Sequence, residues 1–170
     1  GDGTFDDRRT ASAIPELGSF IDIGPGYDFS LGLTSSGTLF AWGAGDMGQL
    51  GSGVGDPLPS PTQVLVIPND SILRMMTSAY QTPFGITNTG EVYGFGYNQY
   101  GGLGTGSFPP PIEQLIPVLI TPLTTPVKVE SSYYHSEALL ANGTVMTWGR
   151  NHRGQLGNGT TINNAVPVQV

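Results

Sequence analysis

The chain repeats itself every 53 residues, and this feature limits its possible folds more than any other. Three stretches align without a gap: SGTLFAWGAGDMGQLGSG at 36–53, TGEVYGFGYNQYGGLGTG at 89–106 and NGTVMTWGRNHRGQLGNG at 142–159. Self-similarity at a period of about 20 to 50 residues is typical of folds built from copies of one small unit. The repeat predicts units over about 1–50, 51–103 and 104–156, with 157–170 beginning a further unit.

The same positions carry apolar residues in each copy. They are the aromatic residues Trp42, Phe95 and Trp148 and the leucines Leu50, Leu103 and Leu156. We predict that these residues form the structural core of the repeats. The glycines recur around them, and we expect these to supply positive-φ positions and close backbone packing between units. The stretches AGDM, YNQY and RNHR differ among the copies and are expected to be exposed.

Each unit reads as a set of short β-strands. The apolar runs before the glycine-rich turns cover 20–24, 29–33, 38–42, 72–76, 83–87, 91–95, 127–131, 135–140 and 144–148. Fourth extended segments follow the turns at 61–67, 116–120 and 165–170. The tight turns SSG, NTG and ANG join the second run to the third, which is a hairpin signal. About four strands per repeat is the pattern of a propeller blade. The sequence therefore predicts an all-β array of three four-stranded blades with almost no helix.

These residues also resemble a known repeat family. The segment 135–170 is similar over its whole length to the regulator-of-chromosome-condensation (RCC1-like) repeat, whose consensus joins a His-Ser strand, a WG strand and a GQLG turn. The second unit departs from it at Phe95 and Gly102, and IGPG, TSAY and ESSY replace the usual Cys-Gly. Family members are usually closed propellers of several blades. The resemblance thus implies β-propeller blades that form part of a larger propeller or of a head-to-tail array.

Composition and motifs argue against several functions. The net charge of −7, with only six Lys and Arg residues, argues against nucleic-acid binding. No apolar run reaches the length of about 18 residues typical of a membrane span, so we expect no membrane insertion. GAGDMG at 43–48 matches a dinucleotide motif, but an extended Pro-rich segment follows it where such a site needs a helix. We therefore predict no cofactor.

Catalytic and metal sites are also not indicated. The chain has no cysteine, and its two histidines, His135 and His152, have no grouped partners that would complete a metal site. No pair among the 13 acidic residues is identifiable as a general acid and base. The sequence therefore predicts a protein that is not an enzyme, without catalytic or metal-binding residues.

Three tyrosines share the repeat period. Tyr27, Tyr80 and Tyr133 each lie in the loop that enters the second strand of a unit. Equivalent loops on successive blades would place them in an arc on one face, and tyrosine is enriched at binding hot spots. The alternative is that each ring simply packs beside the next blade. In the RNHR turn, Arg150, His152 and Arg153 form either a small basic patch or a solvated turn.

Two kinds of function remain open. One is a structural scaffold that is extracellular and assembles head-to-tail into a filament or ring, with other copies or further blades of a longer chain packed on each terminal segment. The other is a protein-binding propeller fragment, either inhibitor-like or signalling, because loops on one face of a bacterial relative grip and inhibit an enzyme. The Ran-type nucleotide-exchange role requires a protruding wedge and a complete propeller, and this sequence displays neither.

The sequence also contains three acceptor motifs for N-glycosylation. They begin at Asn69, Asn142 and Asn158. N-glycosylation requires an exposed asparagine in a secreted protein. Few charges and the absence of cysteine accompany these motifs. Together they lead us to expect an extracellular or cell-surface glycoprotein.

Overall fold

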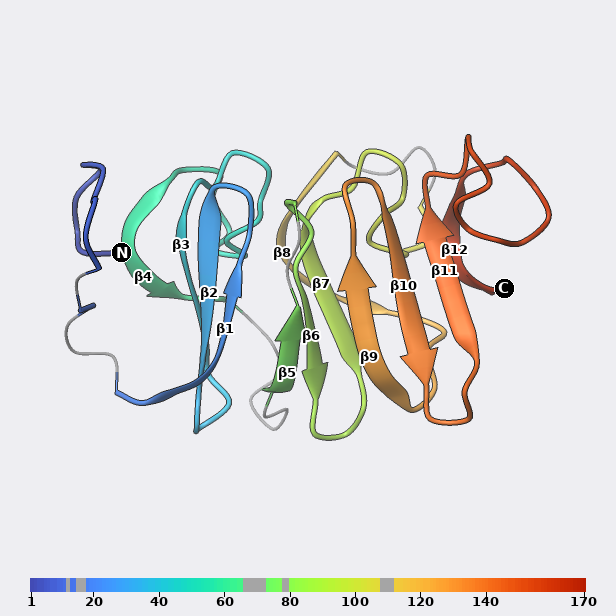
Figure 1. The fold of residues 1–170 in the computed structure, drawn as a ribbon, viewed down its shortest axis with the longest axis horizontal. Coiled ribbons are helices and arrows are strands. Elements are labelled where there is room, and N and C mark those ends of the chain that lie inside the picture. The colour runs from blue at the N-terminus through green and yellow to red at the C-terminus, as the bar shows by residue number, and fades with distance from the viewer. Residues whose placement is uncertain (12, 15–17, 66–72, 78–79, 108–111) are drawn as a thin grey trace.

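Twelve β-strands and no helix make up the described part of the chain, which confirms the predicted all-β class. The structure is a computed structural model that describes residues 1–170 except 12, 15–17, 66–72, 78–79 and 108–111. The strands form three sheets of four strands each, and the sheets stand side by side as blades (Figure 1).

Every blade is an antiparallel meander in which each strand pairs with the next. The first blade contains β1 (Phe20–Pro25), β2 (Phe29–Thr34), β3 (Leu39–Gly43) and β4 (Leu58–Gln63). The second contains β5 (Leu73–Thr77), β6 (Phe84–Thr87), β7 (Val92–Tyr97) and β8 (Glu113–Ile120). The third contains β9 (Pro126–Ser131), β10 (His135–Leu140), β11 (Val145–Gly149) and β12 (Asn164–Gln169). Because β5 contacts both β1 and β9, the first strands of the blades lie together at the inner edge.

The blades are out of phase with the predicted units. The unit boundaries before residues 51 and 104 separate β4 from β3 and β8 from β7, although these strands pair within one sheet. Residues 157–170 complete the third blade instead of beginning a further one, because β12 pairs with β11. A repeat has the same period whichever residue is counted first, so backbone pairing alone decides where a blade ends.

The hairpin turns between second and third strands explain one recurring glycine. Gly143 has a φ of 84°, and its N–H donates to Leu140 O at 2.9 Å. Gly37 and Gly90 make the same bond in the other two blades. This left-handed conformation is free of steric cost only for glycine, so each copy of the hairpin carries one.

The predicted core positions are not equally buried. Leu50, Leu103 and Leu156 are fully buried. Phe95 and Trp148 are 1% and 0% exposed because each packs on the preceding blade; Trp148, for example, meets the Phe84 ring edge-on, at 6.0 Å between centroids. Trp42 differs from the prediction and is only half-buried. The described chain has no blade before the first, so only local groups such as the ring of Phe20 cover Trp42.

One hydrogen bond is repeated where a glycine-rich turn meets the outer strand of the following blade. It joins Gly53 N to Leu115 O at 2.9 Å and Gly106 N to Ala165 O at 2.8 Å. Gly3 N donates to Pro59 O in the same way, at 3.0 Å. Residues 1–4 therefore take the place at the first blade that the turn of a preceding blade has at the other two.

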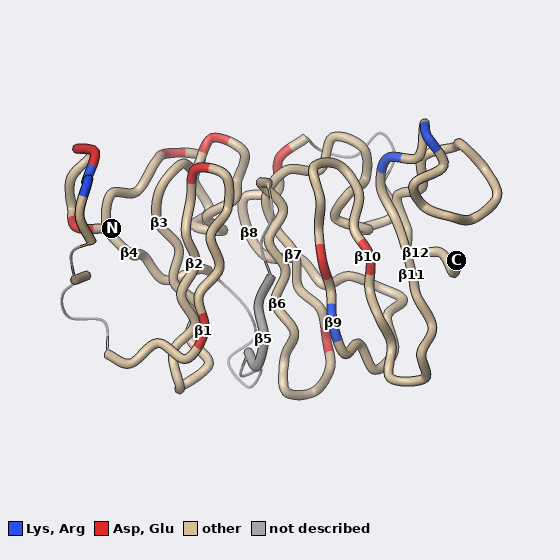
Figure 2. The backbone as a smooth tube through the Cα atoms, in the orientation of Figure 1, with Lys and Arg blue, Asp and Glu red and all other residues tan. Residues whose placement is uncertain are grey.

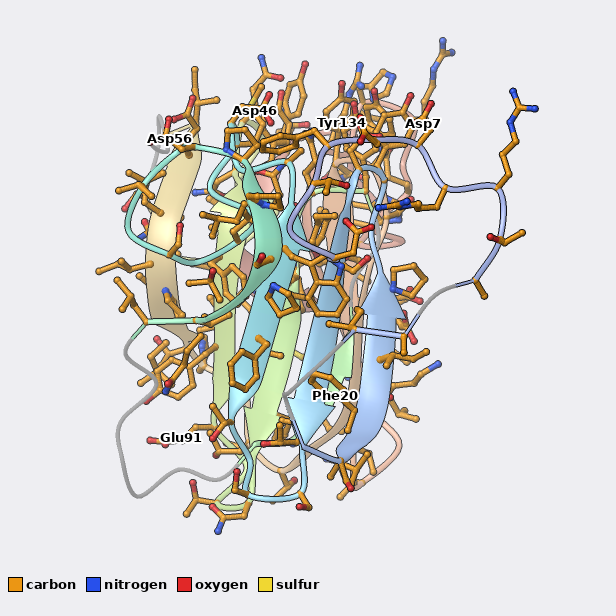
Figure 3. The ribbon with its side chains drawn as sticks, turned by 90° about the vertical axis from the view of Figure 1, so that its left-hand side faces the viewer. Asp7, Phe20, Asp46, Asp56, Glu91 and Tyr134 are labelled. Atoms are coloured by element: carbon orange, nitrogen blue, oxygen red, sulfur yellow. The ribbon has the colours of Figure 1, made fainter. Side chains whose placement is uncertain are left out.

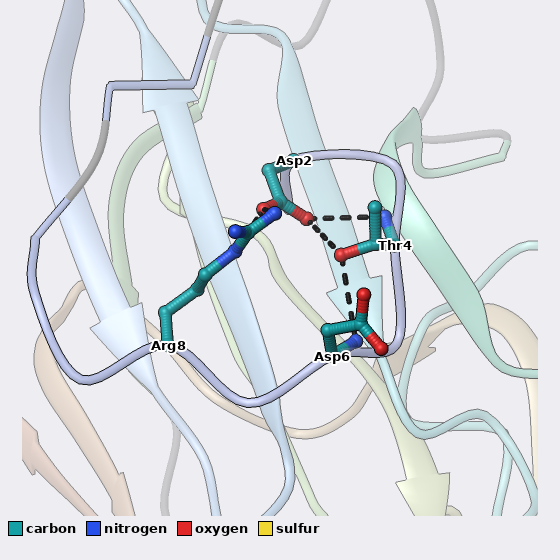
Figure 4. Close-up of polar contacts among 4 residues, drawn as sticks. All are labelled: Asp2, Thr4, Asp6 and Arg8. Atoms are coloured by element: carbon teal, nitrogen blue, oxygen red, sulfur yellow. Dashed lines mark hydrogen bonds and ion pairs between the residues drawn. The ribbon is translucent and has the colours of Figure 1, made fainter.

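The N-terminal turn has the same internal bonding as the turn of the third copy. Asp2 Oδ1 accepts hydrogen bonds from Thr4 N at 3.0 Å and Thr4 Oγ1 at 2.8 Å (Figure 4). Asn158 Oδ1 accepts from Thr160 N at 3.1 Å and Thr160 Oγ1 at 2.9 Å. Arg8 Nε also donates to Asp2, at 2.6 Å. The bonds from Thr4, followed by that from Arg8, lower the pKa of the Asp2 carboxyl to about 2.

Candidate protein-binding face

The three periodic tyrosines lie in contact on one face of the molecule. Tyr27, Tyr80 and Tyr133 occupy the loops between the first and second strands of the three blades. The ring centroids of Tyr27 and Tyr80 are 5.0 Å apart, and those of Tyr80 and Tyr133 are stacked at 3.8 Å. Tyr133 Oη donates a hydrogen bond to Tyr80 Oη at 2.9 Å. The rings pack on one another and still remain accessible, since Tyr27 is 67% and Tyr133 46% exposed.

Three further tyrosines extend this stack, and the repeat pattern did not reveal them. Tyr134 packs on Tyr133 with ring centroids 4.3 Å apart. Tyr100 and Tyr97 contact the other side of Tyr134, at 4.9 and 5.9 Å. We call these residues the tyrosine cluster, which holds six of the seven tyrosines of the chain: Tyr27, Tyr80, Tyr97, Tyr100, Tyr133 and Tyr134.

The sequence indicates only in part that Tyr97, Tyr100 and Tyr134 belong to the cluster. Tyr97 and Tyr100 belong to the variable YNQY turn. This turn was expected to be exposed, but both tyrosines are half-buried and Asn98 is 1% exposed. No equivalent tyrosine occurs in the other copies. Their contact with Tyr134 joins the turn of one blade to the loop of the next. A period reveals positions that recur, so it does not find a contact made at one junction only.

Three hydroxyl groups of the tyrosine cluster, those of Tyr97, Tyr133 and Tyr134, have a raised pKa. The hydrogen bond to Tyr80 raises the pKa of Tyr133 above its usual value, with partial burial adding to the effect. Burial is the main cause that raises the pKa of Tyr97 and of Tyr134. The cluster offers aromatic rings with polar hydroxyl groups, a combination suited to protein surfaces that bind other proteins.

Arg150 closes one end of the tyrosine cluster. Its guanidinium carbon lies 4.8 Å from the ring centroid of Tyr100 and 5.0 Å from that of Tyr134. The other basic residues of this turn, His152 and Arg153, are exposed. The RNHR segment is thus partly a solvated turn and partly the edge of the cluster.

Charged residues around the cluster are unevenly distributed. Asp28, Asp46 and Asp56 are exposed in the loops of the first blade. Figure 3 labels Asp46 and Asp56 at the same end of the molecule as Tyr134. At the upper end of Figure 2, acidic residues lie over the first and second blades, with Lys or Arg also on the N-terminal loop, and the basic turn of 150–153 lies over the third blade. This face is therefore negative at one side and positive at the other.

Comparison with known proteins identifies the fold family. The sequence matches the family described as "Regulator of chromosome condensation (RCC1) repeat" over residues 36–82, 89–139 and 142–170. A second match with the same description covers 20–49 and 127–155. The chain belongs to the RCC1 repeat family. This confirms the resemblance seen in the WG strands and GQLG turns.

Two curated relatives have RCC1-type repeats similar to these. The Ultraviolet-B receptor UVR8 of Arabidopsis thaliana is 33% identical over 153 residues, which are 87% of this chain and 33% of UVR8. The human E3 ubiquitin-protein ligase HERC2 is 32% identical over 143 residues, which are 83% of this chain and 3% of HERC2. The chain therefore spans a third or less of the relatives it matches.

Solved RCC1 structures share the arrangement of the blades. Yeast RCC1 (Prp20) bound to Kap60 superposes with a TM-score of 0.80 at 20% identity, covering 89% of this chain and 37% of Prp20. A second structure of Prp20 gives a TM-score of 0.79 at 20% identity, with 89% and 38% covered. At this identity the likeness shows the fold, and a partial RCC1 propeller accounts for the three blades.

The remaining residues considered in the sequence analysis lie outside the tyrosine cluster. His135 lies at the start of β10 and His152 in an exposed turn. Within the described ranges, no group of three or more His, Cys, Asp or Glu is arranged to hold a metal ion, and no helix is long and apolar enough to cross a membrane. Asn142 is exposed and Asn158 is half-buried, while Asn69 lies outside the described residues.

Proposed function

We propose that this RCC1 segment is a non-enzymatic protein-binding module and that the tyrosine cluster is its contact surface. The observation that carries the proposal is the continuous stack of accessible tyrosines across three blades, of which Tyr27 and Tyr133 are exposed and Tyr80 and Tyr134 are half-buried. Tyrosine is enriched among the residues that dominate binding energy. Rings that already hold one another also lose little conformational freedom when a partner arrives.

The relatives support a protein partner. The structures of yeast RCC1 describe a complex with Kap60 and binding to Gsp1p and histones, all of which are proteins. HERC2 is a ubiquitin ligase, but this chain spans only 3% of it, so we do not extend ligase activity to the chain. The role proposed is therefore recognition, either signalling or inhibitor-like.

Replacing Tyr27, Tyr80 and Tyr133 together by Ala tests this proposal. The triple variant should lose at least about tenfold in affinity for any partner that binds the native chain, because each anchor residue carries about 1 kcal/mol or more. Affinity is measured by biolayer interferometry after affinity capture and identification of the partner. The variant with Leu119→Ala and Val166→Ala, which removes exposed apolar groups on outer strands, is the matched control. Equal binding by all three proteins would contradict the proposal.

A second candidate function is head-to-tail assembly into a filament or ring. The observation in its favour is the uncovered flank of the first blade, where Ile23 is 72% exposed while its equivalent in the third blade, Val129, is buried against the second blade. A hollow of about 420 Å³ lies on this flank, lined in part by Ile14, Phe20 and Trp42. An exposed apolar flank of this kind can pack against another blade.

The opposite flank is less complementary. Glu137 lies on the third blade where the first two blades have the buried residues Leu31 and Phe84. An incoming first blade would meet this carboxylate with apolar side chains, and burying an unpaired charge is costly. Sedimentation over a range of concentrations tests the assembly, which we expect to be weak for the native chain. A species that stays monomeric at every concentration would contradict it.

We further propose an extracellular location with N-glycosylation at Asn142. This asparagine is exposed in the turn after β10, and its Oδ1 accepts a hydrogen bond from Thr144 N at 3.0 Å. Asn158 is half-buried, and its Oδ1 accepts from three donors, Asn151 Nδ2, Thr160 N and Thr160 Oγ1. The native protein purified from its source should carry a glycan at Asn142, detected as a mass loss on treatment with a glycosidase that cleaves N-glycans. A native chain with the unmodified mass would contradict this location.

A further inference from the structure

Arg150 is a fixed cation at one end of the tyrosine cluster. Its guanidinium lies over the rings of Tyr100 and Tyr134 at 4.8 and 5.0 Å. Its backbone N–H also donates to Tyr134 O at 2.9 Å, which ties the main chain to the same residue. Cation–π contacts with two rings hold the charged group in place, so the Arg150 side chain loses little conformational entropy when a partner binds it.

The charge of Arg150 is not neutralised within the part of the chain that the structure describes. The ion pairs there join Arg8 to Asp2 and Lys128 to Glu130. No carboxylate among the described residues pairs with the Arg150 guanidinium. The N–H edge of a guanidinium matches a carboxylate with two parallel hydrogen bonds.

The neighbouring side chains strengthen the positive potential at this end. Arg153 and His152 are exposed in the same turn. Partial burial, followed by the charges of Arg150 and Arg153, lowers the pKa of His152. The third blade therefore presents two permanent positive charges beside the tyrosines, while Asp28 lies next to Tyr27 at the other end of the cluster.

We propose that the tyrosine cluster binds an acidic segment of another protein, with a carboxylate of that segment paired to Arg150 and its apolar side chains on the tyrosines. This proposal rests on the protein-binding function proposed above. The uneven charge of the face orients the bound segment. The acidic end of the segment is attracted to the third blade and repelled by Asp28 at the first blade. The net charge of −7 disfavours a long polyanion, and a short acidic stretch satisfies both constraints.

A library of random dodecapeptides displayed on phage provides the test. Panning on the immobilised native chain should enrich peptides that combine Asp or Glu with apolar residues. Enriched peptides are then synthesised with a fluorescent label and titrated by anisotropy. Arg150→Gln should weaken their binding about tenfold or more, since a charge-assisted bond is lost. Arg153→Gln is the matched control and should weaken binding much less, because this arginine is not held over rings.

Charge reversal and salt sharpen the result. Arg150→Glu should change the selection from acidic to basic peptides, and rising salt should weaken the wild-type complexes. Unchanged far-UV circular dichroism shows that each variant is folded. If peptides need Tyr27, Tyr80 and Tyr133 but are indifferent to Arg150→Gln, the acidic-segment proposal is overturned and the protein-binding function stands. If no peptide is enriched, or the face binds only a second copy of the chain, the acidic-segment proposal is also overturned.

Discussion

Replacing Trp148 by Ala should lower the free energy of unfolding by about 4 to 6 kcal/mol. The indole is fully buried and packs edge-on against Phe84, and truncating such a residue costs about 3 to 5 kcal/mol. The hydrogen bond from Trp148 Nε1 to Gly102 O, at 2.7 Å, adds about 1 kcal/mol. The carbonyl is not orphaned in the variant, because Ser136 Oγ also donates to it at 2.7 Å.

Trp42→Ala is the matched control, since this tryptophan has the same place in the first blade. It is only half-buried, so we expect a loss of about 2 kcal/mol. The free energy of unfolding of both variants is to be measured by urea denaturation at equilibrium. Far-UV circular dichroism monitors the transition, because this signal does not depend on the deleted fluorophore. Equal losses for the two variants would show that burial against the preceding blade is not the source of the stabilisation.

The other predictions concern a turn, a titration and the third-blade flank. Gly143→Ala should lower the free energy of unfolding by about 1 kcal/mol, because of its φ of 84° alone. Gly104→Ala should lower it by at least twice as much, because its Cβ would also lie 2.9 Å from the indole nitrogen of Trp148. Equal losses in urea denaturation would contradict this. Tyr80→Phe should lower the raised pKa of Tyr133 toward its usual value, seen as phenolate absorbance appearing at lower pH. The raised pKa of Tyr133 in the folded chain contributes stability at pH values below the pKa of unfolded tyrosine. This contribution is lost as the pH rises through the raised pKa of the folded chain, so the Tyr80→Phe variant should lose less stability in alkali. Glu137→Leu should strengthen head-to-tail association in sedimentation, and an unchanged mass would argue against that assembly.

Much of the fold could be predicted because it depends on local pattern. The alternation and spacing of apolar residues gave the strands of all three blades, and the glycine of each hairpin follows from a backbone angle that other residues avoid. The unit boundaries were less predictable. Strand β4 pairs with β3 across a long turn. The repeat period alone does not say whether β4 belongs with the strands before it or with those after it.

The candidate site was only half accessible to sequence reasoning. The period linked Tyr27, Tyr80 and Tyr133, which the structure brings into one stack. It did not link Arg150 to Tyr100, since neither residue recurs at the equivalent position of the other copies. Their contact arises where the variable turns of adjacent blades meet, and the period does not predict contacts between positions that differ from copy to copy.

The sequence by itself determined the β class, the four-stranded repeat and the residues whose side chains point into each blade. Only the tertiary structure decided which equivalent positions are covered. Trp42 and Trp148 occupy equivalent positions of the repeat and each precedes a glycine, yet one is half-buried and the other is 0% exposed. Side-chain direction follows from the two-residue period of a strand, which is local. Burial depends on whether another blade lies against that side, and this is a property of the packed array of blades.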